Sequence, residues 1–360
     1  MIPVTKPFLP PLPEYSRYLK GIWKRTWLTN NGPLVNELEI KLKEYLGVPN
    51  CLFVGNGTIA LQMAIKALDL NGEIITTPFS YVATTSSIVW ERCKPVFADI
   101  HPYTLNIDPE GIESKIGPRT EAILATHCFG NPCDIERIQQ IAEKYSLKVI
   151  YDAAHCFGSK YRGKSVFNYG DISTTSFHAT KLFHTIEGGA VFTNSAALND
   201  SLGFLRNFGH NGPELFQGIG INGKNSEVHA AMGLVNLEYI SQIRKKRKEQ
   251  SLYYQQILTD SSIRFIQLEE EEGFNYAYFP VIFPSEKMTL EVKRVLEINQ
   301  IFPRRYFYPS LSKLSYVQGD TPISDDISSR ILCLPVYHDL TREEQDLVAR
   351  FILQTIAPHS

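Results

Sequence analysis

Short apolar runs alternate with amphipathic helical segments through the first 194 residues, and this alternation constrains the fold more than any other feature. The runs CLFVGN, AILATHCFG and LKVIYDAA predict strands. The intervening segments, such as GPLVNELEIKLKEYLG and IERIQQIAEKYSL, place apolar residues at the three- and four-residue spacing of a helix. Strands this apolar, separated by helices, predict an α/β fold with a mostly parallel sheet covered on both faces.

The pattern changes after Asn194. The stretch EVHAAMGLVNLEYISQIRKKRKEQSLYYQQIL predicts a long helix, FNYAYFPVIF a strand, and MTLEVKRVLEIN and TREEQDLVARFILQTI further helices of a small α+β unit. We therefore expect a large domain at 1–240 and a small C-terminal domain at 241–360. The basic cluster 244–248 favours a solvated helix face over a nucleic-acid patch, because acidic and apolar residues flank it.

The composition argues against several classes of partner. The 360 residues carry a net charge of −2, which gives no electrostatic footprint for nucleic acid or an anionic membrane. No apolar run reaches the length of a membrane span, and the proline-rich N-terminus lacks the apolar core of a signal peptide. Cys128 and Cys133 lie near His127, but no second ligand pair follows, so we expect no metal. Six scattered cysteines favour a reduced, cytoplasmic chain.

One stretch, 149–194, combines two residues that pyridoxal 5'-phosphate chemistry requires. Asp152 ends an apolar strand, and Lys181 follows about thirty residues later, ahead of a Gly-Gly pair. An acid at this place can hold the pyridine nitrogen protonated, and a lysine can form the Schiff base and move protons. Taken singly, an Asp at a strand end is usually a cap or turn former, and a lone Lys is usually a surface residue. The pair gains weight from the other parts of the same site.

Those other parts are a phosphate site and a stacking ring. GNGTIALQMAI places Thr58 between a strand and a helix start, where backbone amides and the helix dipole favour a phosphate. Ser176, five residues before the lysine, can add a hydroxyl. Tyr81 follows another strand and offers a flat face for the pyridine ring. The competing interpretations are an ordinary helix cap for Thr58 and core packing for Tyr81.

Across nearly its whole length the chain resembles the DegT/StrS-type nucleotide-sugar aminotransferases, which have the type I fold of pyridoxal phosphate enzymes. The ordered blocks that carry the resemblance are WLTNNGPLVNELE, NGTIAL, PFSYVAT, PVFADIHPYTLNID, YDAAHCFG, SFHATKLFHTIEGG, GINGKNSEVHAAMGL and ILCLPVYHDLTREE. The resemblance implies a large domain with a mostly parallel seven-stranded sheet that binds the cofactor, and a smaller α+β C-terminal domain.

The same resemblance implies roles for eight residues. Lys181 matches the Schiff-base lysine, and Asp152 matches the partner of the pyridine nitrogen. The remaining cofactor-binding positions are matched by His155 near the phenolic oxygen, Gly57, Thr58 and Ser176 at the phosphate, Tyr81 on the ring, and Asn222 at the phosphate of the neighbouring subunit. The position of Asn222 implies a homodimer with shared active sites.

Two residues depart from the family pattern. Lys224 stands where the family often has Arg, and the two are not interchangeable at a planar anion site. Ile186 stands where a Gly usually precedes the residue matched by Glu187, which narrows the loop after the lysine. Related dehydratases carry His at the lysine position, so Lys181 argues against deoxygenation.

The implied reaction is a ping-pong transamination from L-glutamate to a keto-sugar carried on a nucleotide. The blocks WLTNNGPLV, SFHATK and RRYFYP favour dTDP-4-keto-6-deoxy-D-glucose as acceptor and dTDP-4-amino-4,6-dideoxy-D-glucose as product, for O-antigen, lipopolysaccharide or a related glycan. A dTDP-3-keto-6-deoxyhexose and GDP- or UDP-linked 4-keto sugars are the alternative substrates. A cofactor-binding regulator without turnover is an alternative of another class, against which the intact Lys181–Asp152 pair argues.

Overall fold

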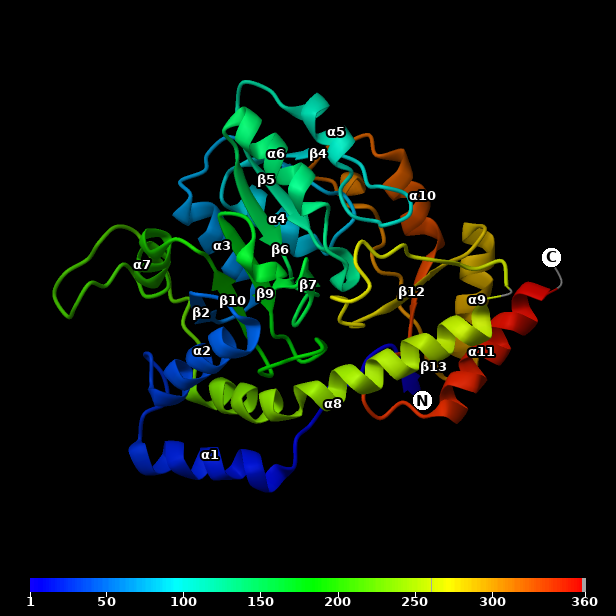
Figure 1. Ribbon diagram of the computed structural model, residues 1–360, viewed down its shortest axis with the longest axis horizontal. Helices are drawn as coiled ribbons and strands as arrows, with labels where there is room; N and C mark the ends of the chain where they lie inside the picture. Colours follow the sequence, from blue (N-terminus) through cyan, green and yellow to red (C-terminus); the bar gives the residue numbers. More distant parts are fainter. Residues whose placement is uncertain (260, 358–360) are drawn as a thin grey trace.

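The computed structural model describes residues 1–259 and 261–357, and a seven-stranded sheet forms its centre (Figure 1). The strands, in their order across the sheet, are β2 (Cys51–Val54), β10 (Gly189–Phe192), β9 (Ile172–Ser176), β6 (Lys148–Asp152), β5 (Thr120–Thr126), β3 (Glu73–Thr76) and β4 (Lys94–Phe97). Strand β10 runs antiparallel to β2 and β9, and the other neighbours pair in parallel. The mostly parallel seven-stranded sheet is thus confirmed.

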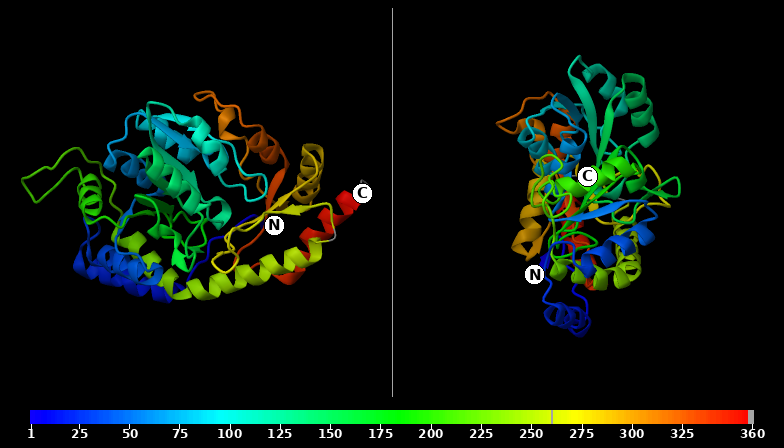
Figure 2. Two further views of the ribbon diagram at one scale, coloured as in Figure 1. Left: turned by 45° about the horizontal axis from the view of Figure 1, so that its top comes forward. Right: turned by 90° about the vertical axis from the view of Figure 1, so that its left-hand side faces the viewer.

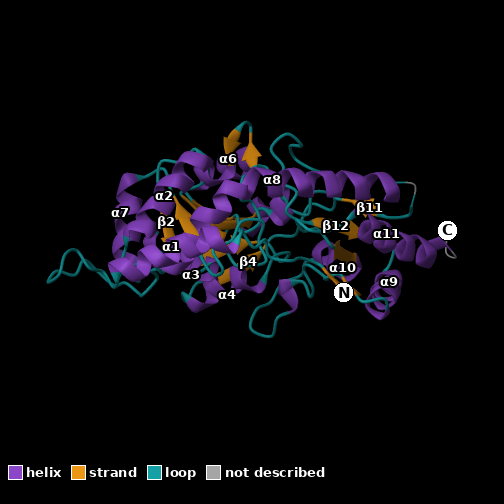
Figure 3. Cartoon of the chain, turned by 90° about the horizontal axis from the view of Figure 1, so that it is seen from below, coloured by secondary structure: helices purple, strands orange, loops and turns teal. Residues whose placement is uncertain are grey.

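Helices cover both faces of this sheet (Figure 3). On β6, for example, Ile150 packs into the core with α3 (Gly57–Ala67), α4 (Val82–Trp90) and α7 (Ala196–Leu205). Its neighbour Tyr151 faces the other core, which α2 (Pro33–Leu46), α6 (Ile135–Tyr145) and α8 (Glu227–Leu258) help to form. Helix α2 ends where Gly47 takes a left-handed conformation with φ 63°. Burial on both faces explains why strands such as β2 and β10 are apolar at every position.

The C-terminal unit is built on a small antiparallel sheet. Its strands are β11 (Arg264–Phe265), β12 (Phe279–Ile282) and β14 (Ile331–Leu334), and its helices are α9 (Glu286–Ile298), α10 (Pro322–Arg330) and α11 (Arg342–Ile356). The N-terminal strand β1 (Ile2–Pro3) joins this unit by pairing in parallel with β13 (Ile301–Phe302). Of the segment FNYAYFPVIF, only the last part is a strand.

The 32-residue helix α8 connects the two units, as the first two figures show (Figure 2). Near its start, Ala230 and Ala231 belong to the core of the large sheet, whereas Tyr254 and Leu258 near its end belong to the C-terminal core. The domain boundary expected near residue 240 falls inside this continuous helix. The division of the chain at that residue stays a prediction.

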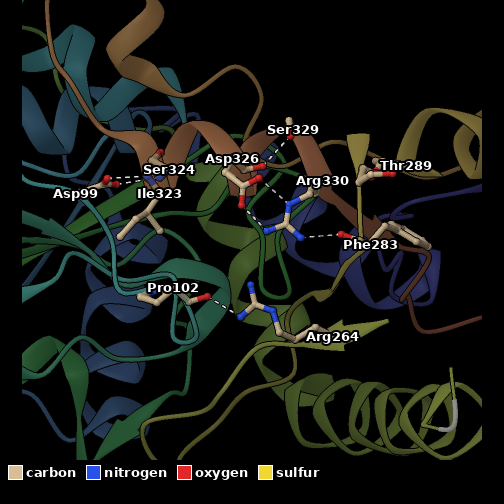
Figure 4. Close-up of polar contacts among 11 residues, drawn as sticks. Asp99, Pro102, Arg264, Phe283, Thr289, Ile323, Ser324, Asp326, Ser329 and Arg330 are labelled. Carbon is tan, nitrogen blue, oxygen red and sulfur yellow. Dashed lines mark hydrogen bonds and ion pairs between the residues drawn. The ribbon is translucent and has the colours of Figure 1, made fainter. Parts of the chain in front are cut away.

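Polar contacts also tie the C-terminal unit to the large sheet (Figure 4). Asp99, just after β4, accepts hydrogen bonds from the amides of Ile323 (2.8 Å) and Ser324 (2.9 Å) at the start of α10. The Arg264 guanidinium donates to the carbonyl of Pro102 (2.6 Å). These contacts fix the C-terminal unit against the side of the sheet where the parallel strands β3, β4, β5 and β6 have their carboxyl ends.

The remaining elements are short, apart from the outer helix α1. They are α1 (Leu12–Arg25), α5 (Pro109–Ile112), the hairpin strands β7 (Lys160–Tyr161) and β8 (Lys164–Ser165), and the 3-10 turns Glu113–Lys115, Cys128–Gly130, Val166–Asn168 and Leu311–Lys313. Within residues 1–259 and 261–357, no helix has the length and apolar character needed to cross a membrane.

Candidate active site

A cavity of ≈ 510 Å³ lies at the carboxyl ends of the parallel strands, where ligands of open α/β sheets usually bind. Seven of the eight residues that the sequence singled out line it, and they are Gly57, Thr58, Tyr81, Asp152, His155, Ser176 and Lys181. They come from the start of α3, the loop before α4, the ends of β6 and β9, and the loops that follow these two strands. The fold therefore brings residues together that are up to 124 positions apart, from Gly57 to Lys181.

Asp152 ends β6 and is buried. Its Oδ2 accepts a hydrogen bond from Thr84 Oγ1 (2.7 Å), and its Oδ1 accepts one from the amide of Ala154 (3.1 Å). Burial raises the pKa of the Asp152 carboxyl, and these two hydrogen bonds and the charge of Lys181 oppose that rise. Each oxygen retains acceptor capacity, so the carboxylate can receive a further N–H donor.

Lys181 lies on the loop between β9 and β10, with its amine inside the cavity. Lys181 Nζ is 3.4 Å from Tyr278 Oη. Burial lowers the pKa of Lys181 to about 8, although the negative charge of Asp152 works against this change. A neutral amine, which is the nucleophilic and basic form, is thus more accessible at neutral pH than for an ordinary lysine.

The start of α3 forms a cup for an anion. The amide of Ile59 is taken by Asn56 Oδ1 (2.9 Å) and that of Ala60 by the Asn56 carbonyl (3.1 Å). Helix geometry leaves the amides of Gly57 and Thr58 without an intrahelical acceptor, facing the cavity with the positive end of the helix dipole. A Cβ on Gly57 would lie only 2.9 Å from the Cβ of Ser176, so a glycine is required for this close approach.

Two rings border the cavity. Tyr81 is 53% exposed at the N-cap of α4, so it is not the core-packing residue of the competing interpretation. His155 is buried, and its Nδ1 accepts a hydrogen bond from the amide of Phe129 (3.2 Å). Burial, followed by the charge of Lys181, holds the pKa of His155 well below its usual value. The neutral ring therefore carries its proton on Nε2, where it can donate to an oxygen.

Asn222, the eighth residue, does not line the cavity. It lies on the arm 206–226 between α7 and α8, where it forms a bridge with Asn207. Lys224 Nζ donates to Asn222 Oδ1 (2.8 Å) and to Asn207 Oδ1 (2.7 Å). Lys224 is thus engaged within its own chain, and the role of Asn222 toward a second subunit stays a prediction.

Ile186, the other departure from the family pattern, adopts a left-handed backbone with φ 71°. This conformation is costly for a β-branched residue. It is held in place by neighbours: His184 Nδ1 accepts from the amide of Ile186 (3.2 Å), and the Glu187 carbonyl accepts from Thr185 Oγ1 (2.8 Å) and Asn225 Nδ2 (3.0 Å). The side chain of Glu187, in turn, lines the cavity.

Comparison with known proteins identifies this arrangement. A model of the DegT/DnrJ/EryC1/StrS aminotransferase family matches residues 13–353. The chain belongs to this family. It is 44% identical over 361 residues to the dTDP-4-amino-4,6-dideoxy-D-glucose transaminase of Shigella dysenteriae, covering 98% of this chain and 97% of that protein.

Two solved structures are similar over most of the chain. One is DesI in the presence of its TDP-sugar product, with a TM-score of 0.93, 30% identity, and coverage of 99% of this chain and 93% of that one. The other is NtdA from Bacillus subtilis with bound cofactor PMP, with a TM-score of 0.89, 26% identity, and coverage of 96% and 82%. The chain is an aminotransferase that depends on pyridoxal phosphate.

The cavity of the aminotransferase fits this cofactor. The cup at Gly57 suits a phosphate, the buried carboxylate of Asp152 retains room for a ring N–H, and Lys181 offers an amine of lowered pKa. The grouping at this cavity also includes residues that the sequence reasoning missed as site residues: Ser80, Thr126, His178, Thr180, Glu187, Arg304, Tyr306 and Phe307. Among them, Arg304, Tyr306 and Phe307 lie in the block RRYFYP, which served only as a mark of resemblance.

Proposed function

We propose that this aminotransferase transfers an amino group from L-glutamate to dTDP-4-keto-6-deoxy-D-glucose, giving dTDP-4-amino-4,6-dideoxy-D-glucose. The observation that carries the proposal is the near full-length similarity to the Shigella dysenteriae transaminase of that name. The cavity supports it, because a lysine and an aspartate suited to the cofactor both line it.

In this proposal the first turn of α3 holds the cofactor phosphate. The amides of Gly57 and Thr58 donate to its oxygens, and Ser176 adds a hydroxyl from the end of β9. Tyr81 stacks on the pyridine ring, and His155 donates from Nε2 to the phenolic oxygen. The role of His155 agrees with its existing hydrogen bond, because Nδ1 already accepts from the amide of Phe129 and leaves Nε2 as the donor.

Asp152 and Lys181 carry the chemistry in this proposal. The bound cofactor supplies an electron sink that makes the proton on the carbon next to the transferred nitrogen removable. Asp152 holds the ring N–H by charge and hydrogen bond. Lys181 Nζ first anchors the cofactor and, once displaced by the amino donor, takes up that proton and later returns it. Its pKa of about 8 suits an amine that must both accept and release a proton near neutral pH.

We further propose a homodimer in which Asn222 completes the partner's phosphate site. The arm that carries Asn222 exposes Leu215, Phe216 and Ile219, each by 65% or more. Exposed apolar side chains gathered on one projecting segment suit an interface. The bond from Lys224 to Asn222 Oδ1 leaves the donor end of the amide, Nδ2, to face an anion.

We place the enzyme in the cytoplasm, serving O-antigen or lipopolysaccharide synthesis. All six cysteines are free and buried, which suits a reducing compartment. The proposed product supports a role in glycan synthesis, because nucleotide-linked sugars are precursors that a later transfer step attaches to a glycan.

A substrate panel tests the proposal. The holoenzyme is incubated with L-glutamate and, separately, the dTDP-4-keto, dTDP-3-keto, GDP-4-keto and UDP-4-keto sugars, and products are identified by mass and NMR. We expect the fastest amination of the dTDP-4-keto sugar, with loss of the visible cofactor absorbance on glutamate addition alone. Faster amination of another sugar would mean that this sugar is the substrate. An absorbance band that does not change on glutamate addition would indicate a cofactor-binding regulator without turnover.

A further inference from the structure

Three hydroxyl groups lead from the cavity wall to Asp152 in a continuous chain. Thr126 Oγ1 donates to Ser80 Oγ (3.1 Å), the hydroxyls of Ser80 and Thr84 are 2.7 Å apart, and Thr84 Oγ1 donates to Asp152 Oδ2 (2.7 Å). All four side chains are at most 5% exposed. They come from four places in the fold: the end of β5, the loop after β3, the first turn of α4 and the end of β6.

The proton directions in this chain follow from counting. A hydroxyl carries one proton. Because Thr84 gives its proton to Asp152, it must accept from Ser80, and Ser80 must then accept from Thr126. All three O–H bonds point toward the carboxylate. This order holds only while Oδ2 of Asp152 is an acceptor, and each bond in such a chain polarises the next.

We propose that Thr84, with Ser80 and Thr126 behind it, is a positioning residue that holds Asp152 ionised and oriented toward the ring nitrogen of the cofactor. The inference rests on the role proposed for Asp152. Burial alone favours the neutral carboxylic acid, and the bond from Thr84 is the strongest influence that opposes it. The amide of Ala154 and the charge of Lys181 add smaller support.

The three hydroxyls also connect Asp152, the proposed partner of the ring nitrogen, with Tyr81, the residue proposed to stack on the ring. Ser80 directly precedes Tyr81, and the amide of Thr84 donates to the Tyr81 carbonyl (3.1 Å). Thr126 and Asp152 are direct neighbours across the parallel pair β5 and β6. The loop that presents Tyr81 to the cavity therefore has its position set by the same hydroxyls that bind Asp152.

The test compares Thr84→Val, which removes the hydroxyl and keeps the shape, with Thr84→Ser, which keeps the hydroxyl. The holoenzyme is loaded with pyridoxal phosphate labelled with ¹⁵N in the ring, and the nitrogen shift is followed against pH. We expect the wild type and Thr84→Ser to keep the protonated-ring signal to higher pH than Thr84→Val. The dissociation constant of the cofactor should rise by roughly ten- to hundredfold in Thr84→Val, as for a lost hydrogen bond to a charged group.

Ser80→Ala provides a graded control, because it removes the middle link and leaves the bond from Thr84 to Asp152. Ser80→Ala should also lower the pH at which the ring nitrogen loses its proton, but by less than Thr84→Val. If Thr84→Val does not fold, Ser80→Ala tests the proposal in its place. The proposal is overturned if the ring nitrogen titrates as in the wild type in both variants, or if Thr84→Ser behaves like Thr84→Val. The ¹⁵N signal requires no sugar substrate. If the variants titrate like the wild type while the wild-type enzyme turns over normally, the result contradicts only this inference and leaves the proposed function in place.

Discussion

The end of the sheet and the arm 206–226 contribute to the same proposed site in opposite ways. At the sheet, Asp152 is buried at the end of β6 and is held by hydrogen bonds from Thr84 on α4 and from the amide of Ala154. The arm extends away from the body beyond α7 (Figure 1), and the bridges Asn207–Asn222 and His210–Phe216 join its own two sides. The sheet half of the site is thus complete within one chain. The arm half needs the second copy of the chain that we propose.

Lys181→Ala should have the largest effect, because it removes the anchoring and proton-transferring amine from the complete half. We expect turnover to fall by at least the roughly 10²–10⁴-fold of general acid–base catalysis, with cofactor still bound by the cup at α3. Steady-state assays and cofactor titration measure both quantities. The exposed Lys164→Ala is the matched control and should be unchanged. A variant that retains a substantial fraction of activity would exclude this role for Lys181.

Asp152→Asn should impair the half-reaction with glutamate more than cofactor affinity. A neutral amide cannot hold the pyridinium charge, and a hydrogen bond between charged groups contributes roughly 1.5–3 kcal/mol. We therefore expect the single-turnover rate with glutamate to fall by about ten- to hundredfold or more. Asp200→Asn, at an exposed position in the middle of α7, serves as the control. An unchanged rate would mean that another acid serves the ring.

The sequence predicted the elements and main residues of the sheet half better than the hydrogen bonds that surround Asp152. Apolar strands, helix periodicity and a stop at Gly47 are local signals, and the strand order then brought Asp152, Lys181 and the start of α3 together. The hydroxyls of Ser80, Thr84 and Thr126 were missed, because serine and threonine are common in strands and helices. The segment after β3 that carries Ser80 and Thr84 meets Thr126 only once β3 and β5 are paired.

The strand expected over FNYAYFPVIF was too long for a physical reason. Asn275 donates from its side chain to the carbonyls of His155 (2.7 Å) and Phe157 (3.1 Å), and Tyr276 has a left-handed backbone with φ 56°. Side-chain bonds of this kind compete with a strand ladder, and a positive φ breaks it. Such contacts depend on segments that are distant in the sequence, so no local pattern predicts them.

The pH dependence of cofactor capture gives a third test of the sheet half. Only the neutral amine of Lys181 attacks the cofactor aldehyde, and burial lowers its pKa to about 8. The capture rate of the apoenzyme should therefore rise about tenfold per pH unit below that value and level off above it. Stopped-flow absorbance measures this rate. In Asp152→Asn the midpoint should move to lower pH, because the charge of Asp152 raises the pKa of Lys181; a midpoint near the ordinary lysine value of 10.5 would contradict the assignment.

Asn222→Ala tests the arm half directly. If Asn222 reaches the partner's phosphate, cofactor binding should weaken by about 1–3 kcal/mol at most, measured by equilibrium titration. Asn211→Ala, on the same arm, should leave cofactor binding unchanged.

Mixing subunits sharpens this comparison. In a heterodimer of Asn222→Ala and Lys181→Ala chains, both lesions fall on one site and the other site carries neither. Activity should then reappear when two impaired parents are mixed and re-associated. Verified heterodimers without recovery would place the action of Asn222 within its own subunit.

The smallest effect concerns Ile186, at the point where the loop after the lysine turns back to β10. A left-handed backbone costs an ordinary L-residue roughly 1–2 kcal/mol, which glycine avoids, although glycine also raises the entropy of the unfolded chain by about 0.4–1 kcal/mol. We expect Ile186→Gly to increase the free energy of unfolding by up to about 1 kcal/mol, measured by denaturant titration of the apoenzyme. Ile186→Ala removes most of the side chain but keeps the backbone penalty, so it should not be stabilised. Equal stability of the two variants would show that backbone strain at Ile186 is relieved elsewhere, and that the loop next to Glu187 is not under the tension that its φ implies.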